Sequence, residues 1–335
     1  MCKKKIVGLV VCAAIALGWG SCGLDLGAVK DVKDACKGQT LEELQKANDL
    51  SDECRDALQD LLPQDESNIA NAKVAVGSGR VGDSRFLFFI ATDENGAPID
   101  LSAAQISVSA DGAQVPESSY TVRLATDIDA TVVSSACALD YSASMLDGDI
   151  GDAIDVYDTL FSIPVGIEAE YGIFSDTVLE KTPFTSDNAA LAAALVRDDS
   201  FVRGSTALFD AMGHGLDAVG GRADALVKLL VVATDGGENA STQFTSESAL
   251  YDLANENGVH IVVLGSLLSD LDFMKRAAEA TDGFYFYSKA FGSLKGMADA
   301  LIAAIEGMGA IEITDTAYTS AAAYEVVVDG TTLTF

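Results

Sequence analysis

The stretch Val132–Met145 reads VVSSACALDYSASM, and it decides how the rest of the chain can be arranged. Its unbroken run of apolar and small residues, β-branched at the start, is typical of a strand covered on both faces in a parallel sheet. Polar side chains follow at alternate positions at its carboxyl end, namely Asp140, Ser142 and Ser144. Ligands of open α/β sheets bind outside the carboxyl ends of the strands, so we expect these three side chains to point into one crevice.

Two further segments carry the same kind of oxygen side chain. Gly204–Asp210 reads GSTALFD and offers Thr206 at the expected start of a helix, while Leu229–Gly237 reads LLVVATDGG, a second buried strand that leads into Asp235. Carboxylates and hydroxyls without a neighbouring His or Cys suit Mg²⁺, Ca²⁺ or Mn²⁺ and are poor ligands for zinc or copper. The candidate metal ligands are Asp140, Ser142, Ser144, Thr206 and Asp235.

In order and spacing, these segments resemble the metal-ion-dependent adhesion site of von Willebrand factor A-type (vWA) domains, and the resemblance covers Asp129 to Met308. It implies that the two serines and the threonine touch a bound ion directly or nearly so, whereas the aspartates act mostly through water. An ion held mainly by neutral hydroxyls keeps water-filled positions, because Mg²⁺ seldom gives up its whole hydration shell. A carboxylate of a protein partner can then replace one water.

Ser142 and Ser144 also have a simpler interpretation, because serines often cap the helix that follows them. That reading explains D-x-S-x-S alone. It does not explain why Thr206 and Asp235 follow in the order and spacing of the adhesion site.

The surrounding pattern predicts an α/β fold with a doubly wound, mostly parallel sheet, because helices and strands alternate through residues 129–309. Residues 67–128 instead show short strands and Gly- or Asp-rich turns such as Asn95-Gly96, typical of a small antiparallel β-sandwich. Alternation returns in residues 310–335. Since a lone hairpin is marginal in water, we expect this tail to join the β-domain and the vWA-like part to be an insertion in it.

Gly77–Gly82 fits the dinucleotide pattern G-x-G-x-x-G, but a strand is expected after it, not a helix. Such a site needs a helix N-terminus for the pyrophosphate. We therefore interpret this segment as a flexible turn.

The N-terminus predicts export. Lysines at 3–5 precede an apolar stretch, typical of a signal peptide over residues 1–21, and the stretch is shorter than the roughly 20 residues that a spanning helix needs. Gly20-Ser21-Cys22 resembles a bacterial lipoprotein signal, in which Cys22 becomes the lipidated first residue; a plain secretory signal is the alternative, because Trp19 departs from the usual pattern. Either way we expect a protein of the cell envelope that is lipid-anchored, periplasmic or on the cell surface.

Residues 22–66 predict a polar helical hairpin with a thin apolar face. A Cys36–Cys54 disulfide would close a loop of about 18 residues and contribute roughly 3 kcal/mol. Cys137, inside the apolar run, is expected to be an inert core residue.

Composition restricts the partners and the chemistry. The 335 residues contain 51 Asp and Glu against 21 Lys and Arg, so phosphate backbones would be repelled and nucleic acid is an unfavourable partner. We expect membrane contact only through a lipid anchor. The imidazoles are His214 and His260, and neither G-x-S-x-G nor H-E-x-x-H occurs, so nothing in the sequence indicates an enzyme.

The sequence thus predicts an extracytoplasmic protein-binding module, for adhesion or assembly, that recognises an acidic residue of its partner through a divalent ion. A structural envelope protein whose metal only stabilises the fold is the first alternative. A hydrolase, with turnover dependent on His214, is the other.

Overall fold

The computed structural model describes residues 54, 65–145, 147–266, 269–289 and 291–335. The expected signal peptide, the lipidation site Cys22 and most of the expected helical hairpin lie outside these residues. Cys54 is buried and disulfide-bonded. Its expected partner, Cys36, lies outside the described residues, so that pairing stays a prediction.

Five parallel strands form the centre of the large sheet. Their spatial order is β8 (Ile167–Phe174), β7 (Val133–Asp140), β10 (Val227–Thr234), β11 (Val259–Ser266) and β12 (Phe284–Ser288). Antiparallel strands flank them, with β9 (Val178–Thr185) beside β8 and β1 (Glu66–Ser67) beside β12. Both faces of β7 and β10 are covered, and this is why their sequences do not alternate between apolar and polar residues.

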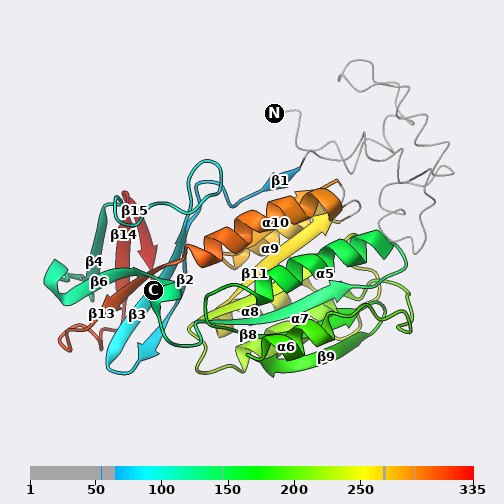
Figure 1. The fold of residues 1–335 in the computed structure, drawn as a ribbon, viewed down its shortest axis with the longest axis horizontal. Helices are drawn as coiled ribbons and strands as arrows, with labels where there is room; N and C mark the ends of the chain where they lie inside the picture. Colours follow the sequence, from blue (N-terminus) through cyan, green and yellow to red (C-terminus); the bar gives the residue numbers. More distant parts are fainter. Residues whose placement is uncertain (1–53, 55–64, 146, 267–268, 290) are drawn as a thin grey trace, which may run out of the picture.

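Helices cover both faces of these strands (Figure 1). One face packs against α5 (Asp147–Phe161), α6 (Asn188–Ala194) and α10 (Phe291–Glu306). The other packs against α7 (Leu208–Gly220), α8 (Glu247–Asn257) and α9 (Leu271–Ala280). Within the described part of the chain, no helix is both long and apolar enough to cross a bilayer. The predicted α/β architecture with a large, mostly parallel sheet is confirmed.

A smaller antiparallel sheet lies at the other end of the molecule (Figure 1). It contains β15 (Thr331–Thr334), β14 (Tyr324–Val328), β4 (Ile106–Ala110) and β5 (Ala113–Gln114). Its Val108 and Val326 share a core with Leu87 and Phe89 of β3 (Ser84–Ala91). The small sheet thereby packs onto β3 and its neighbours β2 (Lys73–Val81), β13 (Gly309–Ile313) and β6 (Tyr120–Leu124). The 3₁₀ turns η1 (Glu117–Ser119) and η2 (Ala125–Asp127) flank β6. The C-terminal strands β13 and β14 therefore pair with strands that precede β7 in the sequence.

The antiparallel strands β2, β3, β13 and β6 are not a separate layer, because β2 also pairs with β10 at Gly77 and Val227 and so joins the large sheet. The interpretation of Gly77–Gly82 as a flexible turn was wrong: β2 runs to Val81, and the turn begins at Gly82, which has φ +60°. A Cβ at Gly77 would lie 2.0 Å from the carbonyl oxygen of Leu226. The glycine is there to let two backbones approach.

Candidate metal centre

The candidate site lies where the strand order reverses. From β7 the chain passes through α5 to β8 on one side, whereas β10 lies against the other side of β7. Connections that leave in opposite directions open a crevice at the carboxyl ends of the two strands. Asp140 is the last residue of β7 and Asp235 directly follows β10, and the pairing of Leu139 with Ala233 brings the two strand ends level.

Buried oxygen atoms from both strand ends are joined by short hydrogen bonds. The Ser144 hydroxyl donates to Asp235 Oδ1 at 2.8 Å, and the Ser142 and Ser144 hydroxyl oxygens lie 3.0 Å apart. Asp140 accepts the Ser142 N–H through Oδ1 and the Thr234 hydroxyl through Oδ2, both at 2.6 Å. Both aspartates are 0% exposed and the three hydroxyl residues at most 4%. Two carboxylates and several neutral hydroxyls are thereby held together away from solvent.

Thr206 completes this cluster from a third segment. A Cβ placed on Gly236 would lie 3.5 Å from Thr206 Oγ1 and 3.6 Å from Ser144 Oγ, so one point beside Gly236 is near both hydroxyls. Thr206 lies in the loop before α7 rather than in the helix, where we expected it. Its backbone N–H donates to Asn239 Oδ1 at 2.7 Å, and its carbonyl accepts the Asn239 N–H at 3.0 Å. The structure therefore brings all five predicted site residues together.

The loop after β10 also fixes the start of α7. The N-cap position of α7 is Ala207, which has no side-chain oxygen, whereas Asp270 caps α9 by accepting the Phe273 N–H. At the start of α7, the Glu238 side chain acts as the cap instead and accepts the Phe209 N–H at 2.8 Å. This contact ties the loop that follows Asp235 to the helix that follows Thr206, so the two halves of the site hold each other in place.

Sequence reasoning missed Thr234, Glu238 and Asn239. Thr234 resembles any β-branched strand residue, so the sequence gives no sign that its hydroxyl supports Asp140. Glu238 and Asn239 act on backbone groups that are distant in sequence. The one available signal was a run of polar residues directly after a buried strand.

The electrostatics favour a cation. Burial raises the pKa of Asp140 to about 6, although hydrogen bonds from Thr234 and Ser142 and the charge of Arg203 oppose the rise. Arg203 lies at the edge, where its guanidinium donates to the Ser142 carbonyl at 3.2 and 3.3 Å. A buried carboxylate costs free energy in its ionised form unless a positive charge compensates it. The donor set of carboxylates and hydroxyls fits a hard divalent ion such as Mg²⁺.

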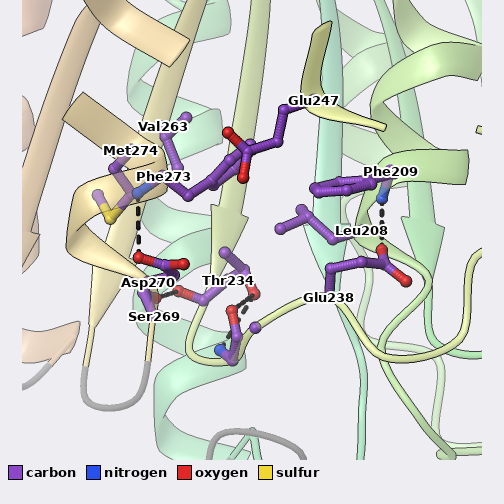
Figure 2. A pocket seen from close by; sticks show the side chains of 12 residues that line it. Leu208, Phe209, Thr234, Glu238, Glu247, Val263, Ser269, Asp270, Phe273 and Met274 are labelled. Carbon is purple, nitrogen blue, oxygen red and sulfur yellow. Dashed lines mark hydrogen bonds between the residues drawn. The ribbon is translucent and has the colours of Figure 1, made fainter. Parts of the chain in front are cut away.

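A pocket opens beside the site, between the end of β10 and the starts of α7 and α9 (Figure 2). Thr234 and Gly236 form the wall that it shares with the oxygen cluster, and Ser269 lies beside Thr234 and donates to its carbonyl at 2.8 Å. The rest of its lining is apolar or acidic, and it includes Leu208, Phe209, Glu238, Asp270, Phe273 and Met274. A ligand at the cluster therefore has an apolar, acidic surface next to it.

Other residues considered from the sequence lie elsewhere. His260 Nδ1 contacts the carbonyl oxygens of Thr281 and Asp282 at 2.9 and 3.0 Å, at the amino end of β11. Cys137 is a buried free thiol, and burial raises its pKa to about 12, so it fits an inert core residue. His214 points toward Glu170 on β8 and not into the metal crevice.

No protein-family model matches the chain, and no curated protein matches its sequence. Solved structures do resemble it in part. One is proximal thread matrix protein 1 from the mussel byssus, whose metal-ion-dependent adhesion site (MIDAS) motif is occupied by zinc. It shares 17% identity over 57% of this chain at a TM-score of 0.47. This chain spans 49% of the mussel protein's length.

Two bacterial structures are also similar. BatB from Bacteroides thetaiotaomicron shares 17% identity over 50% of this chain and 97% of its own, with a TM-score of 0.43. A von Willebrand factor type A structure from Catenulispora acidiphila shares 13% identity over 72% of this chain and 49% of its own, with a TM-score of 0.46. Likenesses at this level say nothing about function.

Proposed function

We propose that this chain is an extracytoplasmic protein-binding module of the vWA type. Its buried oxygen cluster holds a divalent ion, Mg²⁺ or else Ca²⁺ or Mn²⁺, and a carboxylate of a protein partner completes the coordination. The observation that carries the proposal is the convergence of three distant segments: Asp140, Ser142 and Ser144 at the end of β7, Thr206 before α7, and Asp235 after β10.

The residues divide into two roles in this proposal. Ser142, Ser144 and Thr206 offer neutral oxygens to the ion, while Asp140 and Asp235 hold its water molecules and balance its charge. A bound ion supplies a positive centre with exchangeable water positions. Thr234 keeps the Asp140 carboxylate oriented through its 2.6 Å hydrogen bond.

The overall charge supports recognition through the ion. The chain carries a formal net charge of −30, so an acidic partner is repelled at long range. Screening limits this repulsion to roughly 8 Å at physiological ionic strength. A local cation can therefore dominate at contact.

Export to the cell envelope and lipidation at Cys22 belong to the same proposal. The disulfide at Cys54 supports it, because stable disulfides are typical of oxidising compartments outside the cytoplasm.

The structural alternative also has an observation in its favour. The hydrogen bonds from Thr234 to Asp140 and from Ser144 to Asp235 join the ends of β7 and β10, so an ion there would also hold the two strands together. Under this alternative the ion raises stability but no partner depends on it. No observation favours the hydrolase, because the carboxylate that His214 contacts lies on β8 and not in the crevice.

Thr206→Ala separates the two readings when it is compared with Thr281→Ala. Both threonines are 3% exposed, but Thr281 lies at the other end of the sheet, where its hydroxyl donates to Ala277 O at 2.7 Å and accepts the Ile261 N–H at 3.1 Å. Thr281→Ala should therefore lose about 1–3 kcal/mol of stability without touching the site.

The exported chain is immobilised and exposed to envelope extract in Mg²⁺ or in chelator. We expect partner capture only in Mg²⁺, its loss in Thr206→Ala, and its retention in Thr281→Ala. The contrary result is that Mg²⁺ raises the melting temperature of the wild type, while the wild type in chelator and Thr206→Ala both capture as much partner as the wild type in Mg²⁺. In that case the ion is structural and the binding proposal is wrong.

A further inference from the structure

A second group of metal-ligating side chains lies away from the oxygen cluster. It consists of Glu170 on β8, Glu180 on β9 and His214 on α7. Each offers one ligand atom, and these atoms all lie within 4.8 Å of one another. Glu170 pairs in register with Ala136, four residues before Asp140, which is roughly 13 Å along the strand. The two groups are therefore separate.

The glycines beside His214 explain how a helix residue comes so close to the sheet. A Cβ at Gly215 would lie 2.6 Å from Leu230 Cδ1, and one at Gly213 would lie 2.2 Å from the ring of Phe244. Glycine inside a helix costs about 1 kcal/mol relative to alanine. Here it lets α7 pack closely against β10 and against the loop before α8, and so brings His214 to the surface of β8.

The local charge is negative and incompletely balanced. Glu170 is 7% exposed, and Glu180 pairs with Gly172, the next residue of β8 on the same face as Glu170. Like charges on neighbouring strands of one face destabilise a sheet. The imidazole of His214 lies beside these carboxylates. Its pKa is raised chiefly by Glu170 and further by Glu180 and Asp217. Even a protonated His214 leaves an excess of carboxylate charge.

The contact distance is compatible with a shared ion. His214 Nε2 lies 3.4 Å from Glu170 Oε1. A charge-assisted hydrogen bond is shorter, at about 2.7–2.9 Å. Two ligand atoms each about 2.0–2.1 Å from one zinc ion in tetrahedral geometry are roughly 3.3 Å apart. Glu180 is exposed, so its side chain can rotate to close the third ligand position.

We propose that Glu170, Glu180 and His214 form a second cation site that takes Zn²⁺, with water as the fourth ligand. The imidazole distinguishes it from the oxygen cluster, because nitrogen and carboxylate ligands suit borderline transition ions whereas hydroxyls and carboxylates suit Mg²⁺. The inference does not depend on the proposed function of the oxygen cluster.

The two histidines of the chain give a direct test. Zn²⁺ is titrated into the ¹⁵N-labelled chain in excess Mg²⁺, which competes for hydroxyl and carboxylate ligands, and the imidazole resonances are followed by NMR. We expect one Zn²⁺ per chain and a shift of the His214 ring nitrogens. His260, which is held by two carbonyl oxygens, is the internal control and should not move.

Variants identify the ligands. Glu180→Gln keeps the shape of the side chain and should weaken Zn²⁺ binding by roughly tenfold or more, while Asp217→Asn removes a nearby charge without removing a ligand and should change it much less. Thr206→Ala should leave the Zn²⁺ affinity unchanged. Equal losses of Zn²⁺ affinity in Glu180→Gln and Asp217→Asn would overturn the proposal, since the ion would then respond only to the local negative charge. Zn²⁺ binding without a shift of the His214 resonances would also overturn it, since the ion would then bind elsewhere.

Discussion

Removal of the divalent ion should make the stability of this protein depend on pH in an unusual direction. Asp140 is 0% exposed, and burial raises its pKa from 3.8 to about 6 in the metal-free chain. Between these two values the folded state binds more protons than the unfolded state at this residue. Stability from Asp140 is therefore highest at low pH and is lost as the pH rises through 6. Most carboxylates contribute in the opposite direction.

The size of this effect follows from the two pKa values. Between pH 5 and pH 7, linkage gives a loss of about 1 kcal/mol from Asp140 alone. Because other acids also titrate, the quantity to measure is the difference between the wild type and Asp140→Asn, which cannot ionise. In chelator, raising the pH from 5 to 7 should lower the free energy of unfolding of the wild type by about 1 kcal/mol relative to that of Asp140→Asn. This corresponds to roughly 2–4 °C in melting temperature.

Mg²⁺ provides the second arm of the experiment. A bound cation favours the ionised carboxylate, so saturating Mg²⁺ should abolish or reverse the shift. The assay is urea or thermal denaturation at both pH values, in chelator and in Mg²⁺. If the wild type and Asp140→Asn keep the same stability difference at both pH values in chelator, the buried-carboxylate reasoning is refuted.

Further expectations follow from single contacts. Thr234→Val removes the 2.6 Å hydrogen bond to the buried Asp140 carboxylate, so it should cost about 1–3 kcal/mol in metal-free urea denaturation and less in Mg²⁺; an equal cost in both would contradict the role given to that bond. Gly77→Ala would place its Cβ 2.0 Å from Leu226 O and should sharply lower the melting temperature, and a wild-type value would show that β2 and β10 do not pack as described. Cys137 should react with a maleimide only at the rate of unfolding, since it is 3% exposed and its pKa is raised to about 12; rapid labelling of the folded chain would contradict its burial.

Much of the fold could be predicted because its signals are local. The apolar run of β7 and the alternation of helices and strands through residues 129–309 can be recognised in short stretches of sequence, and the structure has helices and strands alternating there. Strand β9 was not expected. The continuity of the large sheet was missed because it depends on one distant residue pair, Gly77 with Val227. Gly77 allows close backbone contact but has the same sequence signature as a turn glycine.

The candidate site shows the same division. Asp140, Ser142 and Ser144 lie at the end of one strand, so their common direction could be deduced from the sequence. Thr206 and Asp235 could be named as candidate ligands, but grouping them with the first three needed the resemblance to vWA domains. Support for the site could not be foreseen: Thr234, Glu238 and Asn239 act on groups that only the folded chain brings near them. Local pattern predicts which side chains face a crevice, but it does not predict what holds them there.

The most direct test of the metal site is a crystal of the protein soaked in Mn²⁺ and measured for anomalous scattering. We expect one strong peak at the ends of β7 and β10, with the hydroxyl oxygens of Ser142, Ser144 and Thr206 roughly 2.0–2.6 Å from it, in the range of Mg²⁺ and Ca²⁺ ligands. A fully soaked crystal with no peak there, or with its only peak elsewhere, would contradict the claim that three distant segments hold one cation.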